Sequence, residues 1–347
     1  MRAVVYRGPS RLCVETIPVP ELSEDEMLIR VHACGICGTD LKKIELGLVP
    51  PPRVFGHEMA GTVVRLGRGA TGFAVGDRVV VQHHIPCRRC FYCEKKLFSQ
   101  CDFYRKTGTT AGFEPAGGGF AEYVRVMDWI VREGTVRIPD DVSFEEASFF
   151  EPMNTCLKAL ETAALRSGEV VAILGQGPVG LMLMQAARCE GAEVIGLDFM
   201  PSRLDVAREL GAQFAFLPDS AEVGSTIARL TDGRGVDLAI VATTDQRAVI
   251  GAQQLTRRGG RVLLFAQTVP GERISVDASC ICMQEKQLIG SYSSSIELQD
   301  KTARTVFNRE VNVARLVTHR FALEQLQEGV ELAAHPSSES LKVMIQP

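Results

Sequence analysis

The pattern of hydrophobic and polar positions divides the chain into two kinds of structure. Over about the first 150 residues, short apolar runs rich in β-branched side chains alternate with turns that contain glycine and proline. The clearest of these runs lie at 27–31, 61–66, 77–82 and 120–126. Short strands separated by turn residues are typical of all-β domains. The pattern therefore predicts a barrel-like β domain, and it places residues 34–58 on its loops.

Beyond Pro139, helical and strand-like segments alternate. Ser143 followed three residues later by Glu146 is a helix-start signal, and 153–164 reads as a helix. Apolar runs with the length of buried strands then follow at 170–174, 193–197, 235–242, 260–265 and 286–290. Strands that alternate with helices predict an α/β fold with a doubly wound parallel sheet.

These patterns predict two domains, as does a length of 347 residues. We expect a first domain over 1–151, with a cysteine-rich lobe at about 87–101, and a second domain over 152–289. Residues 290–347 mix short helices with a final strand at 342–345. This last segment is expected to return to the first domain and complete it.

Composition narrows the functional classes. The net charge of -4 offers no basic surface, so nucleic acid is a poor candidate partner. No apolar run approaches the roughly 18 residues of a membrane span, and the N-terminus has no hydrophobic signal segment. We therefore expect a cytoplasmic protein without a membrane partner. In that compartment the eleven cysteines indicate metal binding or catalysis rather than disulfides.

The segment from Cys34 to Glu58 carries the first candidate metal ligands. It contains Cys37, Asp40, and the pair His57-Glu58. Thiolate and imidazole are preferred zinc ligands, and a catalytic zinc takes about three protein ligands and keeps one position open. Cys37 and His57 are the first two candidates, and the two acids could orient them or join them. The alternative is a buried cysteine, a core histidine and two solvated acids.

A second cysteine group has a more specific spacing. Four thiols fall within fifteen residues, at Cys87, Cys90, Cys93 and Cys101. These gaps allow a tetrahedral sulfur cage around one zinc ion, with no position left open. The site would then be structural and would stiffen a lobe that lacks a core of its own. An iron–sulfur cluster or unconnected surface thiols are the alternatives.

A glycine-rich turn follows the strand predicted at 170–174. Gly175, Gly177 and Gly180 form a G-x-G-x-x-G pattern that opens a helix, and Asp198 ends the next strand. This is the context of a dinucleotide site, with the pyrophosphate on the helix N-terminus. Asp198 would accept from the ribose hydroxyls and repel a 2′-phosphate, which favours NAD over NADP. Arg203 qualifies this preference, because a nearby arginine can accept that phosphate.

Glu151, followed by Pro152, precedes the helix expected at 153–164. Proline just inside a helix start is common. Glu151 could therefore be a working carboxylate at a domain junction or simply a helix cap, and the residues alone favour the cap.

Taken together and in this order, these motifs resemble the zinc-containing medium-chain alcohol dehydrogenase family. Within it the chain is most similar to the sorbitol (polyol) and threonine dehydrogenase branches, which have a carboxylate at the position of Glu151. The resemblance implies a GroES-like β-barrel catalytic domain and a Rossmann domain. It also implies NAD, two zinc ions per chain (one catalytic and one structural), a small alcohol or polyol substrate, and a homodimer or homotetramer.

The resemblance also implies roles for individual residues. Cys37 and His57 would hold the catalytic zinc, with Glu58 and Glu151 as direct, exchanging or water-bridged ligands. Asp40 would fix the tautomer of His57, and Thr39 would receive the substrate's hydroxyl proton. The cofactor would also contact residues on the glycine turn and around the nicotinamide, namely Pro178, Val179, Thr155, Ala266, Ser291 and Tyr292.

Two departures from the family pattern concern the substrate. Lys42 stands where many relatives have a histidine that relays the proton, so the relay would run through Lys42 or through Thr39, the ribose and water. Lys43 stands where sorbitol dehydrogenases tend to have tyrosine, and Ser293-Ser294 where they have an Arg-Tyr pair. The two lysines raise the hypothesis of an anionic substrate. The alternative is that both face solvent.

The sequence thus favours a zinc enzyme that transfers a hydride from a secondary alcohol or polyol carbon to NAD and yields a ketone. A threonine 3-dehydrogenase or a dehydrogenase of phosphorylated alcohols is the alternative within this class. A nucleotide-binding protein without catalysis, and a zinc-free reductase on the same fold, are alternatives from other classes. Both would be expected to lack the metal ligands that this chain has.

Overall fold

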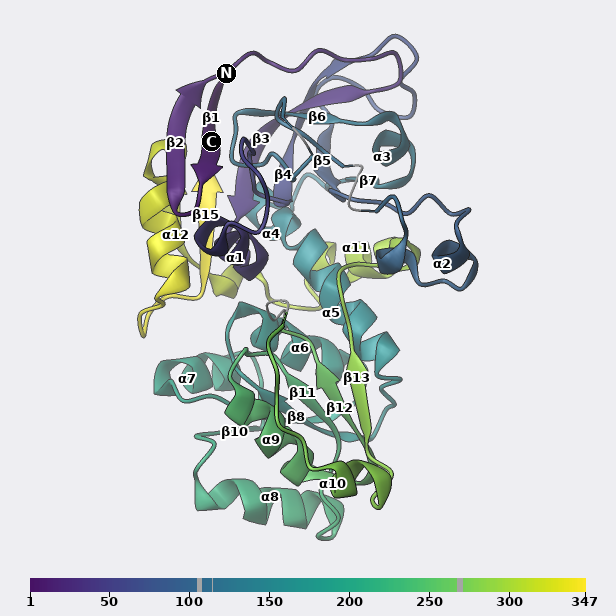
Figure 1. Cartoon of the computed structure of the whole chain (residues 1–347), viewed down its shortest axis with the longest axis vertical. Coiled ribbons are helices and arrows are strands. Elements are labelled where there is room, and N and C mark those ends of the chain that lie inside the picture. The colour runs from purple at the N-terminus through teal and green to yellow at the C-terminus, as the bar shows by residue number, and fades with distance from the viewer. Residues whose placement is uncertain (105–107, 114, 267–270) are drawn as a thin grey trace. The chain divides into compact units, whose positions relative to one another are not determined.

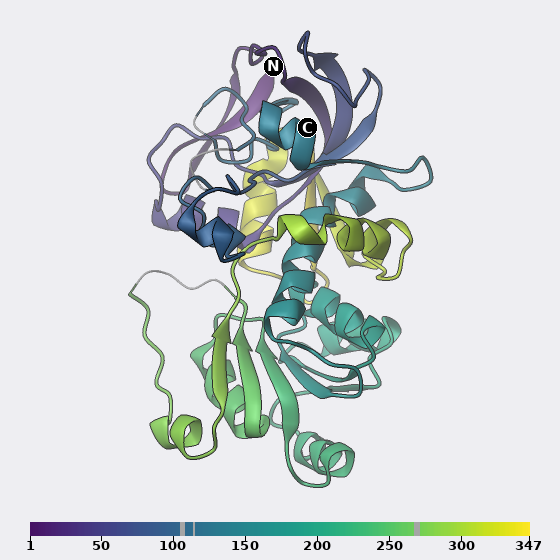
Figure 2. The same ribbon diagram turned by 90° about the vertical axis from the view of Figure 1, so that its right-hand side faces the viewer.

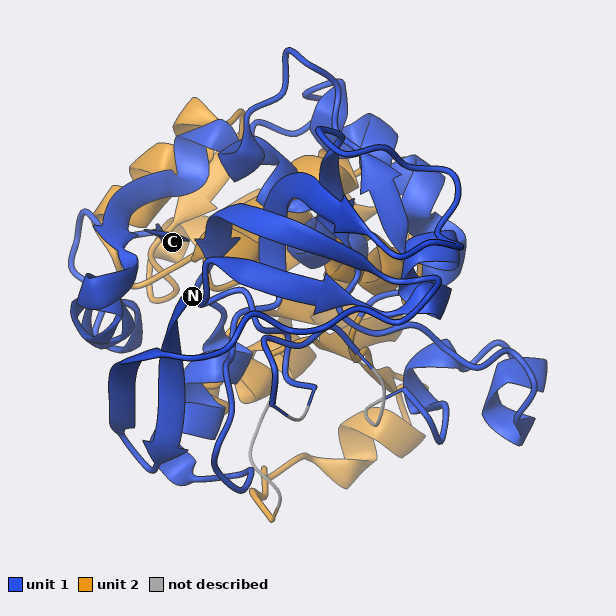
Figure 3. Ribbon diagram, turned by 90° about the horizontal axis from the view of Figure 1, so that it is seen from above, with its two compact units in different colours: residues 1–154, 294–347 blue, residues 155–293 orange. Residues whose placement is uncertain are grey.

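The computed structural model describes residues 1–347 except 105–107, 114 and 267–270. The chain forms two compact units, coloured separately in Figure 3. Unit 1 comprises Met1–Asn154 and Ser294–Pro347, and unit 2 comprises Thr155–Ser293. The fold is mixed α/β, which confirms the predicted fold class.

Unit 1 is built on a mostly antiparallel sheet in the order β14-β15-β3-β4-β5-β7, with β6 also paired to β3 (Figure 1). Each predicted apolar run of the first domain overlaps one of its strands, although the run at 120–126 begins three residues before β6. A separate hairpin, β1 (Arg2–Gly8) and β2 (Arg11–Thr16), accompanies it. The strands of the sheet are β3 (Met27–Gly35), β4 (Glu58–Leu66), β5 (Arg78–Val81), β6 (Tyr123–Val126), β7 (Thr135–Arg137), β14 (Val317–Ala322) and β15 (Lys342–Gln346).

The last strand of the chain lies inside this sheet, between β14 and β3. β15 pairs antiparallel with β3, where Met344 lies opposite Gly35 and Ile345 opposite Cys34. The C-terminal segment therefore reaches the residues that precede Cys37. The helices of unit 1 are α1 (Gly38–Leu46), α2 (Phe91–Glu94), α3 (Asp128–Glu133), α4 (Phe144–Ser148), the start of α5 (Phe150–Thr162), α11 (Gln299–Phe307) and α12 (Leu326–Ala334), with short 3-10 turns at Phe98–Gln100, Ile296–Leu298, Ala314–Leu316 and Leu323–Gln325.

The predicted loop over 34–58 is wrong in part. Cys34 is the last but one residue of β3, α1 includes Asp40, and Glu58 is the first residue of β4. Helix α1 ends at Gly47, which adopts a left-handed conformation with φ of 62°. This is the usual way to stop a short helix, because glycine has no Cβ to clash there. The capping box predicted at Ser143 and Glu146 is present at the start of α4.

Unit 2 is a six-stranded sheet in the order β10-β9-β8-β11-β12-β13, with all neighbours parallel and helices on both faces (Figures 1 and 2). This is the order of the doubly wound dinucleotide-binding fold. Its strands are β8 (Val170–Leu174), β9 (Glu193–Leu197), β10 (Phe214–Phe216), β11 (Val236–Val241), β12 (Thr256–Leu264) and β13 (Gln287–Gly290); its helices are the rest of α5, α6 (Pro178–Cys189), α7 (Pro201–Glu209), α8 (Ala221–Thr231), α9 (Gln246–Leu255) and α10 (Ala278–Cys282).

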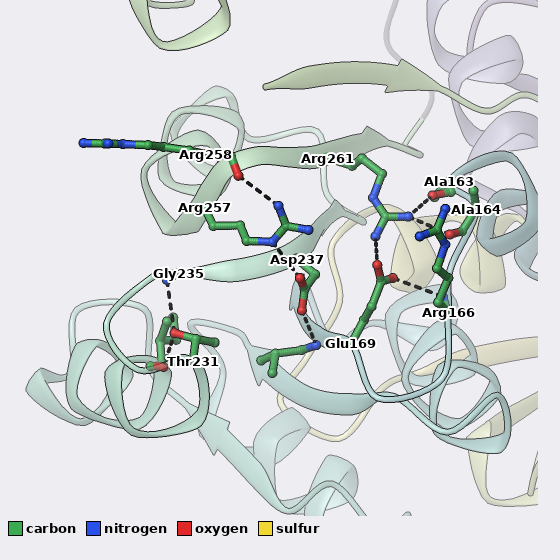
Figure 4. Close-up of polar contacts among 12 residues, drawn as sticks. Ala163, Ala164, Arg166, Glu169, Thr231, Gly235, Asp237, Arg257, Arg258 and Arg261 are labelled. Carbon is green, nitrogen blue, oxygen red and sulfur yellow. Dashed lines mark hydrogen bonds and ion pairs between the residues drawn. The ribbon is translucent and has the colours of Figure 1, made fainter. Parts of the chain in front are cut away.

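A polar network ties together the amino ends of β8, β11 and β12 (Figure 4). Asp237 accepts from the backbone N–H of Val170 at 2.9 Å and from the side chain of Arg257 at 2.6 Å. Arg261 forms an ion pair with Glu169 and donates to two backbone carbonyls just after α5. Glu169 and Arg261 are largely buried, so each needs its partner, whereas Asp237 and Arg257 are half-buried. The network fixes the amino ends of three central strands and leaves their carboxyl ends for a ligand.

Candidate active site

Three metal-binding side chains converge where β3, α1 and β4 meet. Cys37 is the N-cap residue of α1, His57 directly precedes β4, and Glu58 is the first residue of β4. Their ligand atoms all lie within 4.8 Å of one another. His57 and Glu58 are buried, whereas Cys37 is only half-buried. A thiolate, an imidazole and a carboxylate match the ligand chemistry of zinc, and three protein ligands leave a position for water or substrate.

Asp40 lies behind His57. Its carboxyl group is fully buried on α1, and its Oδ1 lies 3.2 Å from the Nδ1 of His57. Burial alone would lower the pKa of His57, but Asp40 and Cys37 outweigh burial and raise it well above its usual value. A carboxylate on the outer nitrogen fixes the tautomer and makes the other nitrogen a stronger metal ligand. The geometry is that expected for an orienting residue.

Glu58 also pairs with a residue that the sequence analysis did not select. Lys342, the first residue of β15, forms a buried ion pair with Glu58, and its ammonium donates to the carbonyl of Ile36 at 3.0 Å. Burial alone would lower the pKa of Lys342, but Glu58 and Cys37 raise it. A Cβ atom on Gly35 would lie 2.2 Å from Glu58 Oε2 and 2.6 Å from Lys342 Cε. The glycine therefore makes room for the pair.

A sequence signal for Lys342 exists. A lysine opens the apolar run predicted as the last strand, 342–345, where a charge needs a buried partner. The identity of that partner follows only from the antiparallel pairing of β15 with β3.

Glu151 lies close to the three ligands but is not one of the group whose ligand atoms meet. It sits in the first turn of α5 and is 7% exposed. Burial raises its pKa to about 7, and the site's His57, Glu58 and Lys342 all act on its charge. Glu151 thus lies near the site in a buried environment. A negative charge on its carboxyl group is unfavourable there unless a cation is bound nearby. The role of Glu151 as a ligand stays a prediction.

The raised pKa of Glu151 predicts an unusual pH dependence of folding stability for the metal-free protein. With a folded pKa of about 7 against 4.5 unperturbed, Glu151 keeps its proton in the folded state after the unfolded chain has lost it. Folding stability should therefore fall as pH rises from about 5 to about 8, by roughly 3 kcal/mol from this residue. Glu151→Gln should remove that decline. Urea unfolding of both metal-free proteins at the two pH values checks this, and equal declines would contradict it.

The remaining predicted residues of this site lie on α1. Thr39 and Lys42 are both half-buried there, Thr39 directly before Asp40. Sequence reasoning did not select His83, whose ring centroid lies 4.7 Å from that of His57. The ring of His83 in turn packs on His84 at 4.3 Å. Two adjacent histidines shortly before the cysteine lobe were the available signal.

The four cysteines of the lobe meet as their spacing predicted. The sulfur atoms of Cys87, Cys90, Cys93 and Cys101 all lie within 4.8 Å of one another. Backbone N–H groups of Cys87 and Phe103 donate to the sulfur of Cys101 at 3.3 Å and 3.4 Å. Burial raises the pKa of the Cys101 thiol, and these backbone bonds act in the opposite direction by stabilising the thiolate. Four thiolates at this separation fit a tetrahedral zinc ion.

The glycine turn of unit 2 has the geometry that a phosphate site needs. Gly175 has φ of 99°, which favours glycine, and a Cβ on Gly180 would lie 1.8 Å from the carbonyl oxygen of Gly175. A Cβ on Gly177 would meet only the side chain of Arg203, at 3.8 Å. Gly177 is the N-cap of α6 and Pro178 its first residue. The open space lies at a helix N-terminus, where a pyrophosphate could approach the backbone.

Asp198 stands beside this turn. Its two oxygens accept from the backbone N–H groups of Gln176 at 2.6 Å and Met200 at 2.8 Å. The carboxylate therefore holds the glycine turn in place as well as lying where a ribose is expected. Arg203 Nη1 lies 3.6 Å from Asp198 Oδ2. The two residues predicted to decide between NAD and NADP therefore form an ion pair.

The other predicted cofactor residues lie in the same unit, mostly just beyond the carboxyl ends of its strands. Val179 follows β8 on α6, Ala266 follows β12, Ser291 and Tyr292 follow β13, and Thr155 lies on α5. Ser291 Oγ is buried without a hydrogen-bond partner among the described residues. Ligands of open α/β sheets bind at this edge.

The donor set in unit 1 and the sheet order in unit 2 define a zinc-dependent dehydrogenase with a dinucleotide-binding domain. Comparison with known proteins agrees. Residues 23–140 match the alcohol dehydrogenase GroES-like domain, and residues 178–308 match the zinc-binding dehydrogenase family. The chain therefore belongs to the zinc-type alcohol dehydrogenase family, as the motifs indicated, and is an oxidoreductase that acts on alcohols.

Individual relatives match over their whole length. The sorbitol dehydrogenase of Bacillus subtilis is 33% identical over 100% of this chain and 97% of its own. A protein of Sinorhizobium meliloti described as a zinc-binding dehydrogenase, solved with NADP bound, has a TM-score of 0.89 and 27% identity over 100% and 99% of the two chains. Galactitol-1-phosphate dehydrogenase of Escherichia coli has a TM-score of 0.86 and 26% identity over 100% of both chains. None of the helices in the described part of this chain has the length and apolar character needed to cross a membrane.

Proposed function

We propose that this enzyme oxidises a secondary alcohol carbon of a polyol to a ketone and passes the hydride to NAD. Cys37 and His57, with Glu58 or Glu151, would hold a catalytic zinc. The observation that carries this proposal is the convergence of Cys37, His57 and Glu58 within 4.8 Å, with Asp40 hydrogen-bonded to His57. The sorbitol dehydrogenase relative supports a polyol as the substrate.

When bound, the zinc would supply Lewis-acid chemistry for the alcohol oxygen, and NAD would be the acceptor of the hydride. The chain's residues prepare for that step. Asp40 holds His57 in the ligand orientation, and Lys342 balances the charge of Glu58. Thr39, one position before Asp40, would take the hydroxyl proton of the substrate and pass it towards solvent, with Lys42 three residues further along α1 as a second candidate for the relay.

The second unit would bind the cofactor. The N-terminus of α6 would take the pyrophosphate at Gly177, and Asp198 would accept from the ribose hydroxyls. Thr155, Val179, Ala266, Ser291 and Tyr292 would line the rest of the cofactor. A second zinc, held by the four lobe cysteines, would be structural because four thiolates leave no open position.

A substrate panel tests this proposal. The zinc-loaded protein should reduce NAD with sorbitol and related polyols faster than with simple secondary alcohols. Removal of metal with a chelator should abolish turnover, and zinc should restore it. Turnover that survives complete metal removal, or no turnover with any alcohol by a protein that binds zinc and NAD, would contradict the proposal.

Cofactor preference has its own test at Asp198. Asp198→Asn removes the charge that would repel a 2′-phosphate, and it keeps an oxygen for the backbone. The ratio of kcat/KM for NADP to that for NAD should rise by roughly 10-fold or more, equivalent to about 1.4 kcal/mol. Asp205→Asn on the nearby exposed surface of α7 is a matched control and should leave the ratio unchanged. An unchanged ratio in Asp198→Asn would show that this residue does not select the cofactor.

We further expect a cytoplasmic homodimer or homotetramer. None of the eleven cysteines, all of which the structure describes, forms a disulfide, and this supports a reducing compartment. Mass measurement of the purified protein in solution would establish its oligomeric state.

A further inference from the structure

We propose that the substrate carries an anionic group, a carboxylate or a phosphate, and that Lys43 and His83 recognise it beside the metal ligands. This inference rests on the proposed function and makes its substrate class narrower. It assigns to Lys43 a role in substrate specificity. From the sequence alone, the alternative was that the side chain of Lys43 faces solvent.

The ammonium group of Lys43 lies near the metal-binding side chains. Lys43 lies on α1, three residues after Asp40, and is half-buried. Its ammonium lies over the ring of Phe55, 6.0 Å from the ring centroid. The same ammonium interacts electrostatically with Asp40 and with His83. Lys43 is therefore turned towards the metal-binding corner of unit 1 and not away from it.

Lys43 has no direct ion-pair partner among the residues that the structure describes. No carboxylate in this part of the chain forms an ion pair with it, although its charge acts on Asp40 at longer range. The nearby buried acids already have partners, because Asp40 contacts His57 and Glu58 contacts Lys342. A half-buried ammonium without a counter-ion favours binding of an anion from outside.

His83 supplies a second, fixed group. Its ring lies between those of His57 and His84, with centroid distances of 4.7 Å and 4.3 Å. The stack continues from His84 to Tyr104 at 5.4 Å, and the Tyr104 hydroxyl lies 3.1 Å from Ser294 Oγ. The ring nitrogens of His83 have no hydrogen-bond partner in the described part of the chain. An imidazole packed against two neighbouring rings, with its nitrogens available, can donate to a carboxylate or phosphate oxygen.

A neutral polyol has no charged group that could bind the ammonium of Lys43 and the imidazole of His83. Hydroxyl groups gain little from an ammonium ion, whereas a carboxylate or phosphate forms charge-assisted hydrogen bonds with it. The contact would also orient the substrate, since the anion would lie at Lys43 and the reacting carbinol at the metal ligands. The two ligand sources, a hydroxy acid and a sugar-alcohol phosphate, share this chemistry.

The test compares matched substrates on the zinc-loaded enzyme. Sorbitol, sorbitol 6-phosphate, gluconate and threonine are assayed with saturating NAD. At least one anionic substrate should have a kcat/KM about 10-fold or more above that of sorbitol, and the best one identifies the anion. Lys43→Met should lower the ratio of kcat/KM for the anionic substrate to kcat/KM for sorbitol by roughly 10- to 100-fold, whereas Lys43→Arg should keep most of the preference. Arg68→Met removes an exposed charge elsewhere and should change nothing.

Inorganic phosphate provides a readout that does not depend on the choice of substrate. With NAD saturating and ionic strength held constant with chloride, phosphate should inhibit sorbitol oxidation competitively in the wild-type enzyme. Its inhibition constant should rise by about 10-fold in Lys43→Met. Normal sorbitol oxidation with no anion preference and no phosphate competition would overturn the inference and leave the proposed function intact. The absence of turnover with every alcohol would overturn both.

Discussion

Replacement of Cys37 by alanine is expected to abolish alcohol oxidation, with kcat/KM lower by at least about 1,000-fold, or roughly 4 kcal/mol of transition-state stabilisation. Cys37 supplies the thiolate of the ligand group, and it is the one member of that group that is only half-buried. The variant should also contain one zinc equivalent fewer than the wild type and keep the zinc of the four-cysteine lobe. Metal analysis and steady-state assays on the same preparation measure both effects.

Cys34 provides a matched control for this prediction. It is a fully buried thiol three residues earlier, and its ligand atom is not part of the group. Cys34→Ala should lose some stability through the cavity that it leaves, but it should keep both zinc equivalents and its kcat/KM within about threefold. A Cys37→Ala enzyme with wild-type zinc content and turnover would show that the metal site is elsewhere.

The largest effect on stability is expected from Lys342→Met. The change leaves the buried carboxylate of Glu58 without its cation, and removal of one partner of a buried ion pair costs about 3–5 kcal/mol. Urea unfolding of the metal-free protein at neutral pH measures this loss. The metal-free form is used because a bound zinc could itself compensate the charge of Glu58.

A second substitution shows whether the pair is responsible. Adding Glu58→Gln to Lys342→Met removes the unpaired charge and should restore most of the lost stability. Lys96→Met breaks an exposed pair with Glu297 and should cost less than about 1 kcal/mol. A loss in Lys342→Met no larger than in Lys96→Met would mean that the buried ion pair does not hold β15 to the site.

The fold followed from the sequence wherever hydrophobic periodicity was strong. The runs that became β8, β9, β11, β12 and β13 were each long enough to be recognised as buried strands. β10 was missed because Phe214–Phe216 is too short for any period, and only its pairing with β9 makes it a strand. α1 was missed because its helical segment is short and polar, and because Gly47 was not recognised as the residue that stops a helix.

The site residues that belong to local motifs could be predicted from residue chemistry and spacing. The four lobe cysteines lie within one short segment, so their spacing alone fixed the group. Cys37 and His57 belong to a familiar motif, although only the fold shows that their ligand atoms meet. Lys342 and His83 could not be assigned in this way, because they reach the site through strand pairing and ring stacking between distant segments. For the same reason the sequence could not distinguish the side of α1 on which Lys43 lies.

Transfer of the substrate's own hydrogen to the cofactor tests the central claim most directly. The zinc-loaded enzyme would be given NAD and a polyol deuterated at the carbinol carbon that becomes the ketone, and the reduced cofactor would be examined by mass spectrometry. The account predicts one deuterium in each NADH molecule formed, together with a slower rate than with the undeuterated polyol. NADH without deuterium, or ketone formed without reduction of the cofactor, would contradict direct hydride transfer and with it the proposed function.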